Sequence, residues 1–219
     1  MTAAITSIRP EAIEARSFAI IEEEFEAQTG RRPQEFAPEE FAIIRRVIHA
    51  TGDFAFAHSL RFHPEAIASA IAMLRAGRPI VTDVRMTMAG ISQPGLSRWG
   101  CPLLCELGRP ELAKEAAALG LTRSETTILA ALEEHVPGLI VIGNAPTALL
   151  AVIKRCQEEP GRFRGVIVGV PVGFVNAAES KELLASQALP HITALGRKGG
   201  SPVAAAIVNA LIRLAAEGV

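Results

Sequence analysis

The chain has 219 residues, of which 49% are hydrophobic, and 22 basic residues stand against 23 acidic ones. This length and composition fit one large domain with a substantial core. The formal net charge of −1 creates no overall field that would favour nucleic acid or an anionic membrane, so we expect neither as a partner. The start of the chain lacks the pattern of a secretory signal, and no apolar run is long enough to span a bilayer. We therefore expect a cytoplasmic protein.

Three helical patterns precede the first strand-like run, and they cover residues 11–28, 38–50 and 64–75. The second pattern opens with a proline and two glutamates, Pro38-Glu39-Glu40, which suit the first turn of a helix. These patterns predict a helical portion over roughly residues 10–76, packed on the remainder of the chain.

His49 lies at the end of the second pattern, in which Phe41, Ile44 and Ile48 recur at helical spacing and Gly52 marks the end. The carbonyl groups exposed at the end of a helix favour a cation, and therefore a protonated imidazole. His49 is a candidate proton donor on this reasoning. The alternative is a histidine that only caps its helix.

Five short apolar runs alternate with helical patterns in the rest of the chain. They are Pro79-Ile-Val-Thr82, Cys101-Pro-Leu-Leu-Cys105, Leu139-Ile-Val-Ile-Gly143, Gly165-Val-Ile-Val-Gly169 and His191-Ile-Thr-Ala-Leu195. The alternation predicts βαβ units, and runs of consecutive apolar residues are typical of strands covered on both faces. We therefore predict a single domain over 1–219, whose α/β portion, 77–219, is a three-layer α/β/α sandwich with a mostly parallel five-stranded sheet.

Ligands of open parallel sheets bind beyond the carboxyl ends of the strands, so the turns that leave the strands are the candidate sites. Asn144 follows the third apolar run and is either a helix N-cap or a hydrogen-bonding group for a substrate. Further along, Asn176 and Glu179 have the spacing of a capping box. Lys181 then falls one turn inside that helix, where it is either a ligand contact or a surface residue.

The turn from Gly196 to Pro202 carries two cations, Arg197 and Lys198, followed by Gly199 and Gly200. Glycine lets a ligand approach the main chain closely, and Ser201 suits the N-cap of the alanine-rich helix that follows. An acidic ligand could sit at that helix start beside the two cations. The alternative is a tight connection with solvated basic side chains.

The three cysteines, Cys101, Cys105 and Cys156, form an odd set that fits reduced thiols better than a disulfide framework. No histidine cluster accompanies them, and we expect no metal site.

Several segments together resemble the precorrin-8X methylmutase and cobalt-precorrin-8 methylmutase family of cobalamin biosynthesis. The segments follow the order of the family along nearly the whole chain: Ile13 to Ile21, Arg46 to Thr51, Thr82-Asp83 with Met86 and Gly90-Ile91, Thr122-Arg123-Ser124, Gly143-Asn144-Ala145-Pro146-Thr147, Gly169 to Lys181, and Gly196 to Ser201. The last of these, with Ala204 to Leu211, resembles most the members of the cobalt-dependent, anaerobic branch. The stretch Thr29 to Gln34 departs from the family, whose members vary in length there.

The resemblance implies a flavodoxin-like fold and an isomerase that needs no cofactor. Its substrate would be a large acid-bearing tetrapyrrole, in which the enzyme moves the ring-C methyl group from C11 to C12. The histidine essential to the family falls on His49, which is thought to protonate the ring-C nitrogen and so promote a [1,5]-sigmatropic shift. The resemblance also implies a homodimer with substrate near the subunit boundary.

The resemblance implies that a set of polar residues spread along the chain binds the side chains of the substrate. They are Arg16, Ser17, Arg123, Ser124, Asn144, Thr147, Arg197, Lys198, Gly199, Gly200 and Ser201. Arginine suits a carboxylate because its planar guanidinium can bind both oxygens.

Two other functions fit parts of the sequence. A tetrapyrrole carrier would use the same turns to hold a reactive pigment without changing it. A nucleotide-binding α/β enzyme would use Gly199 and Gly200 for phosphate, but the chain lacks both a P-loop motif and a well-placed G-x-G-x-x-G after a strand.

Overall fold

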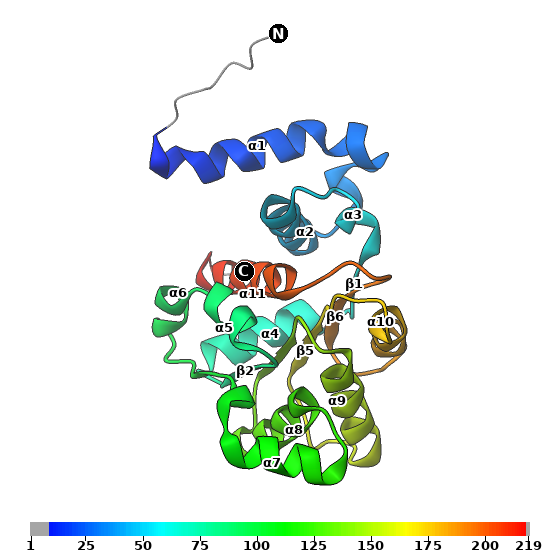
Figure 1. Cartoon of the computed structure of the whole chain (residues 1–219). Coiled ribbons are helices and arrows are strands. Elements are labelled where there is room, and N and C mark those ends of the chain that lie inside the picture. Colours follow the sequence, from blue (N-terminus) through cyan, green and yellow to red (C-terminus); the bar gives the residue numbers. More distant parts are fainter. Residues whose placement is uncertain (1–8, 218–219) are drawn as a thin grey trace.

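The computed structural model describes residues 9–217 (Figure 1). Helices and strands alternate along the second half of the chain, whereas residues 10–51 are mostly helical. In chain order the elements are α1 (Pro10–Thr29), η1 (Pro33–Glu35), α2 (Pro38–Thr51), α3 (Phe56–Ser59), β1 (Leu60–Phe62), α4 (Ala66–Arg75), β2 (Ile80–Thr82), α5 (Arg85–Gly90), α6 (Gln93–Ser97), β3 (Leu103–Leu104), η2 (Glu106–Gly108), α7 (Pro110–Leu119), α8 (Arg123–His135), β4 (Leu139–Ile142), α9 (Pro146–Glu158), β5 (Val166–Gly169), α10 (Ala177–Ala185), β6 (His191–Ala194) and α11 (Ser201–Glu217). Among residues 9–217, no helix combines the length and the apolar character that crossing a bilayer requires.

The sheet has the order β1-β6-β5-β4-β2-β3, and its strands are parallel except for β1. Without β1, the order of the five parallel strands is that of flavodoxin-like folds, in which the first strand lies between the second and the third. The predicted parallel α/β sheet is thus confirmed, but the predicted number of strands, five, is one too low. The sixth strand, β1, is only three residues long and has the exposed Arg61 at its centre. The sequence therefore has no apolar run that would predict this strand.

Two cores cover the two faces of the sheet, because successive residues of a strand point to opposite sides. In β4, Leu139 and Val141 face the core made by α2, α4 and α11. Ile140 and Ile142 face the core made with α8 and α9. Figure 1 shows these helices on opposite sides of the sheet. The predicted three-layer arrangement is confirmed.

The three predicted N-terminal helices are present as α1, α2 and α4. Helix α2 packs on α11, and α1 lies across α2 on the side away from the sheet (Figure 1). The buried ring of Phe25 in α1 meets the Phe41 ring of α2 edge to face, with the centroids 5.1 Å apart.

A carboxylate reinforces this arrangement. Glu14 of α1 accepts a hydrogen bond of 2.7 Å from Arg46 of α2 and also pairs with Arg213 of α11. The hydrogen bond from Arg46 and the neighbouring Arg213 hold the pKa of Glu14 at about 2, against the opposing effect of burial. The carboxylate is therefore ionised throughout the neutral range and ties α1 to two other helices.

Candidate functional site

The turns that leave β2, β4, β5 and β6 converge at the carboxyl edge of the sheet. In the flavodoxin-like order, the chain reverses its direction of winding between β2 and β4, and ligands of such folds bind at this point. Gly143, which follows β4, packs against the start of α11 so closely that an added Cβ would lie 2.9 Å from Cα of Ser201. This edge therefore brings the Asn144 and Ser201 turns into direct contact.

Asp83 occupies the centre of this edge. Its buried carboxylate accepts hydrogen bonds from the backbone N–H groups of Gly143 (3.1 Å), Asn144 (2.8 Å) and Ala145 (2.8 Å). Burial raises the pKa of Asp83, and the three N–H donors oppose that rise. The three N–H groups at the start of α9 are thus satisfied by the chain's own carboxylate, so they are not available to a phosphate. This arrangement argues against a nucleotide site at this turn.

The Thr87 hydroxyl links Asp83 to the glycine-rich turn. It donates a hydrogen bond of 2.9 Å to Oγ of Ser201 and lies 3.4 Å from Oδ1 of Asp83. The N-cap role predicted for Ser201 is wrong, because α11 begins at Ser201 itself and its buried hydroxyl accepts this bond. The N-cap alternative for Asn144 is wrong as well, since the N-cap residue of α9 is Ala145. The Asn144 residue is exposed, and its backbone N–H is held by Asp83.

The glycine-rich turn is held from several sides. Gly200 has a φ of 114° and donates from its N–H to the carbonyl of Val170 at 2.8 Å. Gly199 approaches the same carbonyl so closely that an added Cβ would lie 2.2 Å from its oxygen. Both positions therefore require glycine. The carbonyl of Lys198 accepts a hydrogen bond of 2.6 Å from Nζ of Lys181, which is fully buried. Of the two alternatives for Lys181, the surface position is wrong: α10 turns this side chain inward, beneath the turn.

The two cations of the turn differ in how they are paired. Nζ of Lys198 lies 2.6 Å from Oδ2 of Asp53, and this hydrogen bond lowers the pKa of Asp53. Arg197 forms no ion pair with a carboxylate in the described part of the chain, and its guanidinium lies 5.3 Å from the centre of the Phe174 ring. Phe174 itself is 83% exposed. Arg197 is therefore the cation of this turn that a carboxylate ligand can reach with the least competition.

The starts of α8 and α9 bring four of the predicted substrate residues to the same edge. The hydroxyls of Thr122 and Thr147 lie 2.8 Å apart and join the two helix starts. Thr122 also caps α8 in a capping box with Glu125, a feature that the sequence analysis missed. The exposed Arg123 donates from Nη2 to the carbonyl of Leu107 at 2.7 Å. Ser124 is half-buried beside it, and Asn144 precedes α9.

His49 lies in the last turn of α2, three residues before Gly52, whose φ of 65° ends the helix. Its half-buried imidazole meets the Phe18 ring of α1 edge to face, with centroids 5.3 Å apart and planes at 82°. Asp53, just beyond the helix end, is the partner of Lys198. The Asp53–Lys198 pair therefore joins the end of the His49 helix to the glycine-rich turn.

Arg16 and Ser17 precede Phe18 on α1, so they belong to the helix that covers His49. Arg16 donates to Glu23 of the same helix at 3.2 Å, and Ser17 donates to the carbonyl of Ile13 at 2.9 Å. Phe18 also lines a cavity of about 340 Å³ between α1, α2 and α11. Of this segment, Phe18 contacts His49, whereas the contacts of the Arg16 and Ser17 side chains lie within α1.

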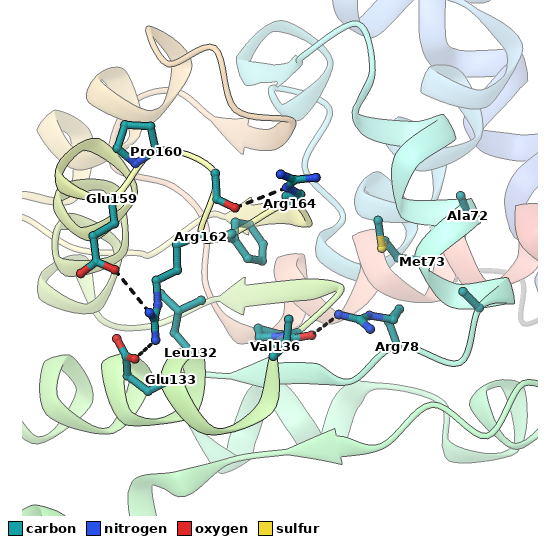
Figure 2. Close-up of a pocket in the computed structure, with 14 residues that line it drawn as sticks. Ala72, Met73, Arg78, Leu132, Glu133, Val136, Glu159, Pro160, Arg162 and Arg164 are labelled. Atoms are coloured by element: carbon teal, nitrogen blue, oxygen red, sulfur yellow. Dashed lines mark hydrogen bonds and ion pairs between the residues drawn. The ribbon is translucent and has the colours of Figure 1, made fainter.

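The capping box predicted for Asn176 is wrong. Asn176 precedes α10 as expected, but its φ of 59° is left-handed and its side chain makes no capping hydrogen bond. A cavity of about 1050 Å³ lies away from the predicted residues and includes none of them (Figure 2). Residues 9–217 contain no group of three histidine, cysteine or acidic side chains suited to a metal ion.

Lys181 should make the stability of the protein depend on pH. Burial lowers the pKa of its amine to about 8, whereas the pKa of an unfolded lysine is about 10.4. Between these values the unfolded chain binds more protons than the folded one, so the free energy of unfolding rises with pH, by at most about 1.4 kcal/mol per unit. Urea unfolding at about pH 7.5 and about pH 10 should show wild type gaining stability relative to Lys181→Met. An unchanged difference between the two proteins would contradict the assigned burial.

Comparison with known proteins identifies the family of this chain. The sequence model described as precorrin-8X methylmutase matches residues 12–214. A cobalt-precorrin-8 methylmutase of Priestia megaterium is 39% identical over 97% of this chain and 92% of its own length. Another, of Salmonella typhimurium, is 43% identical over 93% of this chain and 95% of its own length. The crystal structure of a precorrin-8X methylmutase from Thermus thermophilus superposes with a TM-score of 0.84 and 36% identity, over 95% of this chain and 97% of the other.

The family match over residues 12–214 includes both cores and the turns at the carboxyl edge. This chain belongs to the precorrin-8X methylmutase family.

Proposed function

We propose that this chain is the isomerase of cobalamin biosynthesis that moves the ring-C methyl group of precorrin-8X or cobalt-precorrin-8 from C11 to C12. The products would be hydrogenobyrinate or cobyrinate, respectively. The observation that carries the proposal is the family match over residues 12–214, together with near-full-length relatives that bear the names of these enzymes. Cobalt, where present, belongs to the substrate.

The reaction breaks the bond between the methyl carbon and C11 and makes a bond from that carbon to C12. The reaction consumes no electrons and no protons overall, so a proton donor must recover its proton before the next turnover. Protonation of the ring-C nitrogen makes the macrocycle a better electron acceptor and thereby promotes the [1,5]-sigmatropic shift. The proton then returns to the imidazole as the product forms.

His49 is suited to this role by its place in the last turn of α2, where its imidazole is half-buried. The Phe18 ring packs against one edge of the imidazole and limits its freedom to turn. The Asp53–Lys198 pair then holds this helix end against the glycine-rich turn. A substrate gripped by that turn would lie on the histidine side of the sheet edge.

The remaining predicted residues would hold the carboxylates of the substrate. Arg197 offers a guanidinium that forms no ion pair in the described chain, and Arg123 uses only one donor, toward the carbonyl of Leu107. A guanidinium has five N–H donors, so both side chains retain enough for a bidentate bond to a carboxylate. Asn144 and Thr147 lie between them in the fold and would add neutral hydrogen bonds.

Incubation with the substrate under anaerobic conditions tests the proposal. Catalytic amounts of protein should convert precorrin-8X or cobalt-precorrin-8 into a pigment of equal mass with a different visible spectrum. Mass spectrometry and absorption spectroscopy would follow the conversion. Recovery of the pigment unchanged after tight binding would instead identify a tetrapyrrole carrier.

A further inference from the structure

The cavity of about 1050 Å³ lies at the amino edge of the sheet, opposite the turns that leave the strands. Pro137, shortly before β4, and Phe163, shortly before β5, form part of its wall. Met73 of α4 forms another part (Figure 2). Its volume is about 1050 Å³, which equals or exceeds the roughly 300–1,000 Å³ of typical ligand sites. The cavity is therefore large enough for a sizeable organic molecule and is separated from the proposed catalytic site by the length of the strands.

Its walls combine apolar side chains with guanidinium groups. Met73, Leu132 and Phe163 supply apolar surface. Arg78 and Arg164 reach the cavity from different walls (Figure 2). Arg78 donates to the carbonyl of Val136 at 2.8 Å, and Arg164 makes a long contact of 3.4 Å with the carbonyl of Gly161.

Neither of these two cations forms an ion pair with a carboxylate of residues 9–217. Arg162 in the same wall does, because it pairs with Glu133 and lies 3.4 Å from an oxygen of Glu159. The acidic side chains of the cavity are thus both directed to Arg162. Arg78 and Arg164 are left as positive charge beside an apolar floor, an arrangement complementary to an anion with an apolar body.

Val136 in the cavity wall has a strained backbone. Its φ of 41° and ψ of 61° are left-handed, and a β-branched side chain strongly disfavours this region. Helices α1, α2 and α7 end in the same conformation but use glycine there, namely Gly30, Gly52 and Gly120. The valine side chain is also 59% exposed, although it offers apolar surface to the cavity. Strain of this kind is concentrated at functional sites.

We propose that this cavity is a second ligand site, which binds an amphipathic organic acid. The apolar body of the ligand would lie on Met73, Leu132, Phe163 and Val136, and its anionic group would be bound by Arg78 and Arg164. The site is independent of the methylmutase reaction, because it contains none of the residues assigned to that reaction.

The test uses 8-anilinonaphthalene-1-sulfonate, an anion with an apolar aromatic body, titrated into the full chain and followed by fluorescence. The variant Arg78→Gln/Arg164→Gln should bind the probe at least about tenfold more weakly than wild type. Lys154→Gln, an exposed cation on α9 outside the cavity, is the matched control and should bind as wild type does. Arg197→Gln, at the opposite edge, should also retain this binding, which separates the second site from the proposed catalytic one.

Two further variants test the same site without changing the charge of the protein. Ala72→Phe, on the exposed side of α4, places a ring in the cavity and should also weaken probe binding. Val136→Gly removes the strain and one apolar wall, so it should keep or raise Tm while it weakens binding. Circular dichroism would show that the double arginine variant is folded. The proposal is overturned if this variant binds the probe with wild-type affinity, or if Lys154→Gln loses as much affinity as the double variant.

Discussion

Replacing His49 by glutamine is expected to lower kcat for the methyl shift by about 10²–10⁴-fold, the usual contribution of a positioned general acid. Glutamine keeps the approximate volume and polarity of the imidazole at the end of α2, but it cannot protonate the ring-C nitrogen. Tm and the affinity for the pigment should therefore change little. The rate would be measured anaerobically from the change in the visible spectrum, with Tm from circular dichroism.

His58→Gln is the matched control for this experiment, because His58 is an exposed histidine in the last turn of the neighbouring short helix α3. It should turn over substrate at the wild-type rate. Near-normal turnover by His49→Gln would show that the proton comes from elsewhere. Loss of pigment binding by the same variant would instead assign His49 to binding.

Asp83→Asn should cost about 2–4 kcal/mol of folding free energy, the largest stability effect that we expect from a single polar substitution in this chain. The carboxylate accepts from three backbone N–H groups and lies next to the Thr87 hydroxyl. An amide has only one oxygen, so its NH₂ group must face at least one of these donors. Urea unfolding would measure the loss.

The same change should raise KM more than it lowers kcat, because Asp83 orients the Asn144 turn without contacting His49 in the structure. For the stability measurement, Asp53→Asn serves as the control, since the Asp53 side chain is 30% exposed and forms one ion pair, with Lys198. That substitution should cost less than about 1 kcal/mol. Equal losses of stability in the two variants would refute the central place given to Asp83.

The buried strands and the order of the layers could be predicted from the sequence because their signals are local. Runs such as Leu139 to Ile142 are apolar at every position, which is typical of central strands covered on both faces. Strand β1 carries no such signal, because its pairing with β6 depends on a distant segment. Its existence is a property of the assembled sheet.

The candidate site shows the same division. The turn at Gly199 and Gly200 could be found from its composition, and the structure explains its glycines by the approach to Val170. The inward position of Lys181 could not be found, because a lysine one turn inside a helix is ordinarily solvated and the carbonyl that it binds comes from seventeen residues away. Asp83 gave only one local signal, an acidic residue directly after a buried strand, and its role needs the turn sixty residues later.

In many flavodoxin-like proteins the crevice where the sheet reverses its winding binds the phosphate groups of a ligand. Here the backbone N–H groups at that point are already hydrogen-bonded to the side chain of Asp83, which follows β2. Phosphate mimics should consequently make poor inhibitors of this protein. On the proposed assignment of Arg123 and Arg197 to the substrate's carboxylates, an effective competitor would instead carry several separate carboxylate groups.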